Sequence, residues 1–201
     1  YIKIQDGCNQ YCSYCIIPQV RGTFRSRPIP SIMKEAKNLA ATGVKELILI
    51  AQDTTRYGLD LYGTYSLANL LKELSKIDEI KWIRVLYMYP TKITPELIET
   101  MATVEKICKY VDMPMQHVDD NLLRLMNRQG GSEDVSKTIV RLREAIPDIT
   151  IRSTFIVGFP GETEENFHRL LNFLKETQLD RVGIFSYSPQ AGTLSSRFPY
   201  N

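Results

Sequence analysis

Six short apolar runs rich in β-branched residues alternate with longer segments of helical periodicity along this chain of 201 residues. This alternation is typical of successive βα units, which build a mainly parallel sheet covered by helices. We expect the strands at residues 1–5, 46–51, 82–87, 107–113, 150–157 and 181–187. A complete barrel of eight βα units usually needs about 250 residues. The sequence therefore predicts an α/β fold, a partial and open TIM-like barrel of six βα units.

Three of the segments between these strands carry residues that begin helices. Thr94 precedes a proline, which is favoured at the first helical position because it has no N–H to leave unpaired. Ser132 and Thr163 are further candidate N-caps, since their hydroxyl groups can accept hydrogen bonds from free backbone N–H groups. These signals place helices after the third, fourth and fifth strands.

The composition is that of an ordinary globular protein, with 43% hydrophobic and 24% charged residues. We expect residues 1–201 to form one domain, because this length lies within the usual range for a single core. The net charge of +2 is too small to indicate a nucleic-acid partner, so direct binding of nucleic acid is not expected.

No feature of the chain indicates a membrane or a secretory route. The longest apolar runs, such as residues 46–51, are far shorter than the roughly 20 residues that span a bilayer. A cytoplasmic protein is therefore predicted. The chain begins at Tyr1, without Met and inside an expected strand, so we expect it to be a piece of a longer protein.

Three of the four cysteines, Cys8, Cys12 and Cys15, lie within eight residues directly after the first expected strand. In a parallel α/β architecture the chemistry lies at the carboxyl ends of the strands, and this loop is at such an end. Three thiolates that converge there can hold a 4Fe-4S cluster with one iron left open, and that iron can bind the amino and carboxylate groups of a cofactor. Cys108 lies in an apolar run and is interpreted as a core thiol.

Two other interpretations of the cysteine loop stay open at this point. A disulfide or a set of inert buried thiols fits poorly with three close cysteines in a polar loop. A structural zinc site usually has two pairs of ligands, and here only Cys12 and Cys15 form such a pair. Its fourth ligand would have to be Cys108 or His117, both far away in the sequence.

The spacing Cys-x3-Cys-x2-Cys with Tyr14 before the last cysteine resembles the signature of the radical S-adenosylmethionine superfamily. The segments CSYCIIPQVRGTFRSRP, AQDTTRYG, YMYPT, MPMQH and FIVGFPGETEE resemble the methylthiotransferase branch of that superfamily. Within this branch the resemblance is to members that modify an aspartate of a small-subunit ribosomal protein. The alternative members modify an adenosine of transfer RNA, and they typically have an Asn-rich segment at residues 51–58 and a serine in place of His117.

The resemblance implies a radical SAM core that reductively cleaves S-adenosylmethionine, with Cys8, Cys12 and Cys15 as the ligands of a 4Fe-4S cluster. The electron would come from a reductant such as flavodoxin or ferredoxin, and the resulting 5′-deoxyadenosyl radical would act on the β-carbon of the aspartate. Members also carry an amino-terminal domain with a second 4Fe-4S cluster and a carboxyl-terminal TRAM-like β-barrel. Since the chain contains neither, the isolated core is expected to cleave the cofactor without completing methylthiolation.

Five further residues are candidates for binding S-adenosylmethionine, each with a structural alternative. Gln52 and Asp53 end the second strand, where they could bind the ammonium or ribose groups or instead cap the following turn. Gln116 and His117 end the fourth strand, and Gln116 is the better candidate for binding the ribose. Arg152 needs an anion, which is either the cofactor carboxylate or an internal acid. Tyr14 could shield the cluster, contact adenine or simply pack in its loop.

Overall fold

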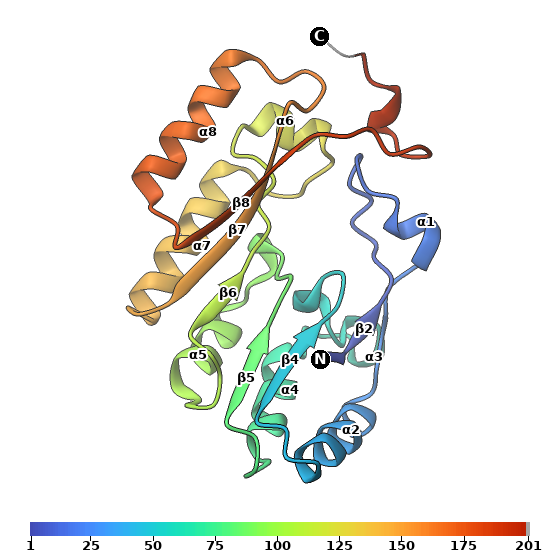
Figure 1. Ribbon diagram of the computed structural model, residues 1–201, viewed down its shortest axis with the longest axis vertical. Helices are drawn as coiled ribbons and strands as arrows, with labels where there is room; N and C mark the ends of the chain where they lie inside the picture. The colour runs from blue at the N-terminus through green and yellow to red at the C-terminus, as the bar shows by residue number, and fades with distance from the viewer. Residues whose placement is uncertain (200–201) are drawn as a thin grey trace.

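The computed structural model describes residues 1–199. Six parallel strands follow one another across the molecule in chain order, in two three-stranded sheets (Figure 1). The first sheet has the order β1 (Ile2–Lys3), β4 (Glu46–Ile50), β5 (Trp82–Val85). The second has the order β6 (Tyr110–Asp112), β7 (Thr150–Val157), β8 (Arg181–Ser186). This is the open α/β arrangement that the alternation of apolar runs predicts.

The two sheets join at a narrow seam between β5 and β6. A single parallel bridge pairs Ile83 with Ile107, and the N–H of Met88 donates to the carbonyl of Asp112 at 2.8 Å. The expected strand at residues 107–113 is therefore shorter than predicted, because only Tyr110–Asp112 pairs continuously with β7.

The first expected strand, at residues 1–5, divides into two pieces. β1 pairs in parallel with β4, whereas β2 (Gln5–Asp6) turns away and pairs antiparallel with β3 (Arg25–Ser26). The intervening chain contains α1 (Ile17–Arg21) and the three close cysteines. The β2–β3 pair thus closes the base of the cysteine loop, residues 7–24.

Helices follow the strands along the chain, and some of them lie behind the strands in Figure 1. Those after the first, second and third strands are α2 (Ile29–Ala41), α3 (Leu59–Tyr62), α4 (Leu67–Ser75) and α5 (Pro95–Thr103). Those after the fourth and fifth are α6 (Asp120–Leu125), α7 (Ser132–Ala145) and α8 (Glu164–Thr177). None of the helices in residues 1–199 combines the length and the apolar character that crossing a bilayer requires.

The core lies between the strands and these helices. Leu47 and Leu49 of β4 and Ile83 of β5 are at most 1% exposed, and Leu70 and Leu74 of α4 are fully buried against the sheet. Burying a side chain of this size contributes about 1.5–3 kcal/mol. This packing fixes the helices against the sheet and leaves the carboxyl ends of the strands free to form a site.

Two of the three predicted N-caps are confirmed. The hydroxyl of Thr94 accepts from the N–H of Leu97 at 3.1 Å, and Thr163 begins α8 in the same way. The prediction for Ser132 is wrong, because Gly131 is the N-cap and Ser132 is the first residue of α7. The N–H of Ser132 instead donates to Asp120 at 2.8 Å.

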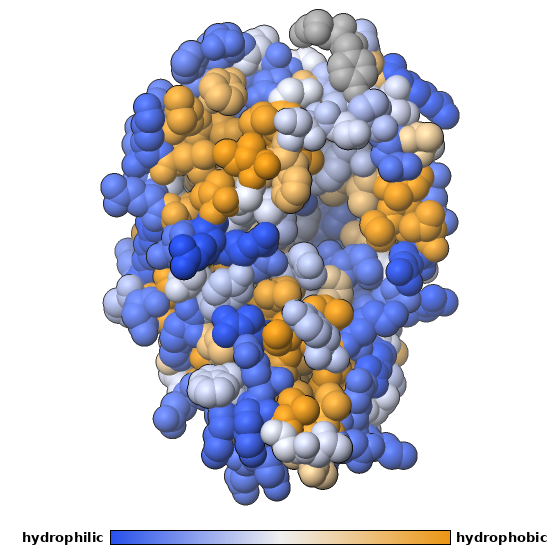
Figure 2. Space-filling model, in the orientation of Figure 1, coloured by the Kyte–Doolittle hydropathy of each residue, from blue (hydrophilic) through white to orange (hydrophobic). Residues whose placement is uncertain are grey.

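The outer edge of the second sheet is apolar and exposed. Val182, Ile184 and Phe185 of β8 are 41%, 55% and 60% exposed, and within the described chain β8 pairs with β7 alone. Figure 2 shows apolar surface in the upper left of the molecule, over the region of β8 and α8. The barrel is therefore open along β8.

Candidate functional site

A cavity of about 620 Å³ lies at the carboxyl ends of the strands. The eight residues predicted to hold the cluster or the cofactor all line it: Cys8, Cys12, Tyr14, Cys15, Gln52, Asp53, Gln116 and Arg152. Its walls come from both sheets and from the cysteine loop. The rule that chemistry gathers at this edge of a parallel sheet therefore led to residues that the fold brings together.

The cysteine loop presents three free thiols to the cavity. Cys12 is buried, whereas Cys8 and Cys15 are half-buried. Burial raises the pKa of Cys8 to about 11 and also raises the pKa of Cys15. Both are therefore protonated thiols near neutral pH, and a bound metal would have to displace their protons.

Glycine is required at the start of this loop. Gly7 has a φ of +79°, and a Cβ there would lie 2.2 Å from the carbonyl oxygen of Thr23. Because other residues rarely adopt such a φ and have no room here, Gly7 fixes the direction in which the chain leaves β2.

Two distant segments hold the middle of the loop. The N–H of Ser13 donates to the carbonyl of Met126 at 2.9 Å, and the carbonyl of Ser13 accepts from the N–H of Ser195 at 2.9 Å. The side chain of Asn127 donates to the carbonyl of Tyr11 at 2.8 Å. The positions of the cysteines are therefore set by the chain after α6 and by the segment after β8.

Tyr14 belongs to an aromatic cluster beside the cavity. Its ring meets the ring of Phe159 edge to face at 6.5 Å, and Phe159 also packs on Tyr187 and Phe198. Burial raises the pKa of Tyr14, so its hydroxyl stays neutral. Tyr14 therefore packs on Phe159 and also lines the cavity, and its role toward the cluster or adenine stays a prediction.

Gln52 and Asp53 both lie at the end of β4, but their surroundings differ. The carboxylate of Asp53 is 2% exposed and caps the 3₁₀ turn Thr54–Arg56, accepting from the N–H of Thr55 at 3.1 Å. Asp53 thus caps the turn that follows β4, which is the structural role considered for it from the sequence. The Oε1 of Gln52 is buried and has no hydrogen-bond partner in residues 1–199, which leaves it available to a ligand.

Gln116 and Arg152 approach the cavity from the second sheet. Gln116 has a φ of +73°, which is uncommon for a residue other than glycine and recurs at ligand sites. Arg152 is not buried as the apolar run suggests, since its side chain is 37% exposed. Its Nη1 donates to Asp112 Oδ1 at 2.6 Å, so an internal acid is present, while the guanidinium still lines the cavity.

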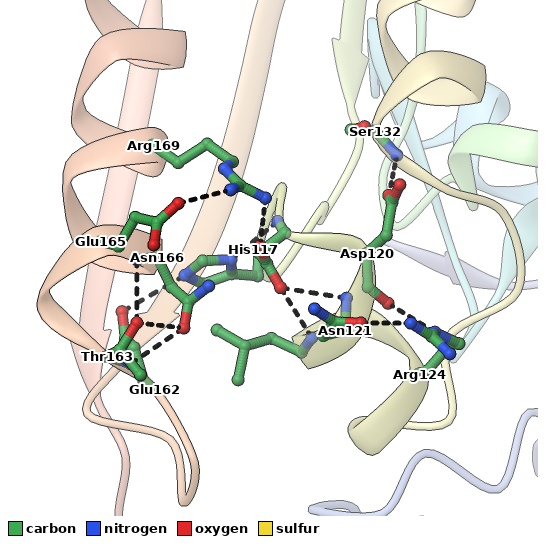
Figure 3. Close-up of polar contacts among 12 residues, drawn as sticks. His117, Asp120, Asn121, Arg124, Ser132, Glu162, Thr163, Glu165, Asn166 and Arg169 are labelled. Atoms are coloured by element: carbon green, nitrogen blue, oxygen red, sulfur yellow. Dashed lines mark hydrogen bonds and ion pairs between the residues drawn. The ribbon is translucent and has the colours of Figure 1, made fainter.

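His117 is fully buried and holds the loop after β7 (Figure 3). Its Nδ1 accepts from the N–H of Asp119 at 3.0 Å, so the ring proton is on Nε2, which lies 3.2 Å from Glu162 Oε1. The other oxygen of Glu162 accepts from the N–H groups of Gly158 and Phe159. His117 is therefore a structural residue that joins the ends of β6 and β7.

Arg128 is a cavity residue that sequence reasoning missed. Its guanidinium lies over the ring of Tyr89 at 4.3 Å, and its Nη2 donates to the carbonyl of Pro114 at 2.5 Å. Arg128 comes after α6, whereas the sequence prediction considered only residues that directly follow a strand. It brings a cation to the wall of the cavity beside Cys12 and Tyr14.

The arrangement of the thiols suits a cluster better than a single ion. Within residues 1–199, no three His, Cys, Asp or Glu side chains converge closely enough to hold one metal ion. In a 4Fe-4S cluster each thiolate binds a different iron, so the sulfurs surround the cluster instead of meeting at one point. The three thiols of the cysteine loop, which line one cavity, fit that demand.

Residues 2–174 of the chain match the Radical SAM superfamily. The chain belongs to the radical SAM superfamily. Among curated proteins, the radical SAM chain is 57% identical over 197 residues to the ribosomal protein uS12 methylthiotransferase RimO of Clostridium botulinum. It is 54% identical over 199 residues to the protein of the same name from Moorella thermoacetica. These matches cover 98% and 99% of the chain but 44% and 46% of the relatives, so the chain spans less than half of their length.

Solved structures confirm the expected fold of this radical SAM chain. The methyltransferase TsrM of Kitasatospora setae, solved with cobalamin and a 4Fe-4S cluster bound, gives a TM-score of 0.74 at 20% identity and covers 92% of the chain and 36% of TsrM. Methylornithine synthase (PylB) gives a TM-score of 0.67 at 15% identity, covering 99% of the chain and 56% of PylB. At this identity the likeness shows the fold alone.

Proposed function

We propose that this chain is the S-adenosylmethionine-cleaving core of a RimO-like methylthiotransferase that modifies an aspartate of ribosomal protein uS12. The observation that carries the proposal is one cavity lined by three free thiols of a Cys-x3-Cys-x2-Cys loop and by the polar ends of the strands. The 57% identity to a RimO protein over nearly the whole chain supports the ribosomal-protein branch over the transfer-RNA branch.

Cys8, Cys12 and Cys15 would each bind one iron of a 4Fe-4S cluster and leave the fourth iron open. When bound, the cluster supplies the electron that cleaves S-adenosylmethionine to methionine and a 5′-deoxyadenosyl radical. The cofactor carries the difficult step, and the task of the chain is to bind, orient and exclude water. The enclosing cysteine loop and the aromatic cluster of Tyr14 and Phe159 suit that task.

The other cavity residues would hold the cofactor. Gln52 offers an acceptor without an internal partner, and Gln116 presents its amide from the opposite sheet. Arg152 keeps donors beyond the one that pairs with Asp112, so it can take part in binding a carboxylate. Tyr14 would contact adenine or cover the cluster with its ring.

The remaining parts of the reaction belong to the longer protein. Its additional domains would hold the second 4Fe-4S cluster that supplies sulfur and the TRAM-like β-barrel, and the chain described here would form the radical SAM domain over residues 1–201. We propose a cytoplasmic location, since the substrate is a ribosomal protein, and a reductant such as flavodoxin or ferredoxin.

Anaerobic reconstitution tests the proposal directly. We expect about four irons and four sulfides per chain and, after chemical reduction with S-adenosylmethionine, 5′-deoxyadenosine detected by chromatography. The same chain should transfer no methylthio group to uS12, since after the three ligands only Cys108 remains for a second cluster. Stoichiometric zinc without iron-sulfur absorption, or an intact reduced cluster without 5′-deoxyadenosine, contradicts the proposal.

A further inference from the structure

Gln10 lies between the first two cysteines of the loop and has half of its amide unused. It is 8% exposed and lines the cavity. Its Nε2 donates to Asp53 Oδ2 at 2.8 Å, whereas its Oε1 has no hydrogen-bond partner in the described part of the chain. We propose that Gln10 is a cofactor-binding residue, whose Oε1 accepts a hydrogen bond from the amino group of S-adenosylmethionine, and that Asp53 is the positioning residue that orients it. This inference rests on the proposed function.

The chemistry of Asp53 determines which way the Gln10 amide points. A carboxylate has no hydrogen to donate, so the amide atom that faces Asp53 has to be the nitrogen. The oxygen is thereby held on the other side. The orientation of Gln10 thus follows from its partner, although the two amide atoms are similar in shape.

Asp53 itself has little capacity left for a ligand. One oxygen accepts from both the N–H and the hydroxyl of Thr55, and the other accepts from Gln10. The residue is 2% exposed. Asp53 therefore acts through Gln10, which separates its role from that of Gln52 at the same strand end.

The position of Gln10 indicates which part of the cofactor it meets. Its backbone N–H donates to Cys8 Sγ at 3.4 Å, so the residue lies against a thiol that would bind the cluster. The open iron of a cluster held by the three cysteines would bind the amino and carboxylate groups of S-adenosylmethionine, so a residue beside Cys8 is placed to meet the amino-acid end of the cofactor. An acceptor shielded from bulk water is unfavourable until a donor reaches it, and the amino group is a strong donor.

The test measures equilibrium binding of S-adenosylmethionine and of its desamino analogue to the anaerobically reconstituted chain. We expect Gln10→Leu to weaken binding of S-adenosylmethionine by about tenfold, because the hydrogen bond that the amino group would donate to Gln10 Oε1 is lost. The desamino analogue should bind the wild type and Gln10→Leu equally. Gln5→Leu is the matched control, since Gln5 is 1% exposed, has an unpartnered amide and does not line the cavity.

Iron content and thermal unfolding of the apo chain are measured for every variant, so that binding is compared at equal cluster loading. If Gln10→Leu fails to load, Asp53→Asn decides, because it changes no residue of the cysteine loop. The asparagine oxygen is needed by Thr55, so its NH₂ group faces Gln10, whose amide then has to rotate. We then expect several-fold weaker binding in Asp53→Asn. Binding equal to wild type in a loaded variant overturns the inference, whereas a wild-type chain without cluster or cofactor binding overturns the proposed function instead.

Discussion

The backbone N–H of Ser195 donates to the carbonyl of Ser13, 2.9 Å away, across more than nine-tenths of the chain. On its other side Ser13 donates to Met126 at the same distance. The cysteine loop is therefore held from both sides by backbone hydrogen bonds. Such pre-organisation reduces the entropy that ligand binding would otherwise have to overcome.

Ser195→Pro should loosen the cysteine loop, because proline has no N–H to donate to Ser13. We expect faster hydrogen exchange at residues 8–15 of the apo chain, corresponding to a loss of about 0.5–1.5 kcal/mol of local stability. Ser195→Ala is the control, since it keeps the N–H and removes only the hydroxyl, which lies 2.8 Å from the Tyr187 hydroxyl. Equal exchange in both variants would show that the backbone contact is unimportant.

Replacing Cys8, Cys12 or Cys15 by Ala should strongly reduce iron uptake, because each thiol lines the cavity and would bind one iron. Cys108→Ala should retain iron uptake, since Cys108 does not line the cavity. It lies at the seam between the sheets, where its N–H donates to the carbonyl of Ile83. Iron and sulfide counting after anaerobic reconstitution compares the four variants. Similar loss in the Cys108 variant would refute the ligand assignment.

Glu162→Gln should destabilise the fold even though the two side chains have nearly the same shape. The glutamine oxygen is needed by the N–H groups of Gly158 and Phe159, so its NH₂ faces the Nε2–H of His117, and two donors meet in a buried place. We expect a loss of about 1–3 kcal/mol in urea unfolding. Glu165→Gln, at an exposed carboxylate of α8, should change stability by less than about 0.5 kcal/mol.

Asp60 should make stability depend on pH in the acid range. Burial alone would raise its pKa, but hydrogen bonds from Ser26 outweigh this and leave the pKa below its usual value. A lowered folded pKa stabilises the fold above the unfolded pKa, and this stabilisation is lost as the pH falls through the folded value. Asp60→Asn should therefore be less stable than wild type at pH 7, by less than about 1 kcal/mol, and should approach it near pH 3. A difference that is constant between these pH values contradicts this account.

The strands and the cavity residues could be predicted because both follow from local pattern. Short apolar runs mark the strands, and the residues directly after them, such as Gln52 and Gln116, have to gather at one edge. Arg128 and Gln10 could not be found in this way. Arg128 comes to the cavity only through the packing of α6, and the importance of Gln10 depends on the carboxylate of Asp53, which lies 43 residues away.

Other errors come from tertiary pairing. The run at residues 1–5 is apolar enough for one strand, but Gln5 pairs with Ser26 instead of continuing beside β4. The partner of Arg152 could not be chosen from the sequence, because Asp112 lies on the neighbouring strand in the same register. Pairing across strands is set by the whole fold and leaves no local signal.

The narrow seam between β5 and β6 couples occupancy of the cavity to cohesion of the whole domain. Gln52 and Tyr87 line the cavity from one side of the seam, and Gln116 and Phe185 line it from the other. A molecule that contacts both groups bridges two halves whose sheets meet at the β-bridge between Ile83 and Ile107 and at the hydrogen bond from Met88 to Asp112. By linkage, each tenfold rise in its concentration above the dissociation constant adds about 1.4 kcal/mol to the stability of the joined state. We therefore expect proteolysis at the seam to be fastest in the empty domain and to slow as the cavity is filled.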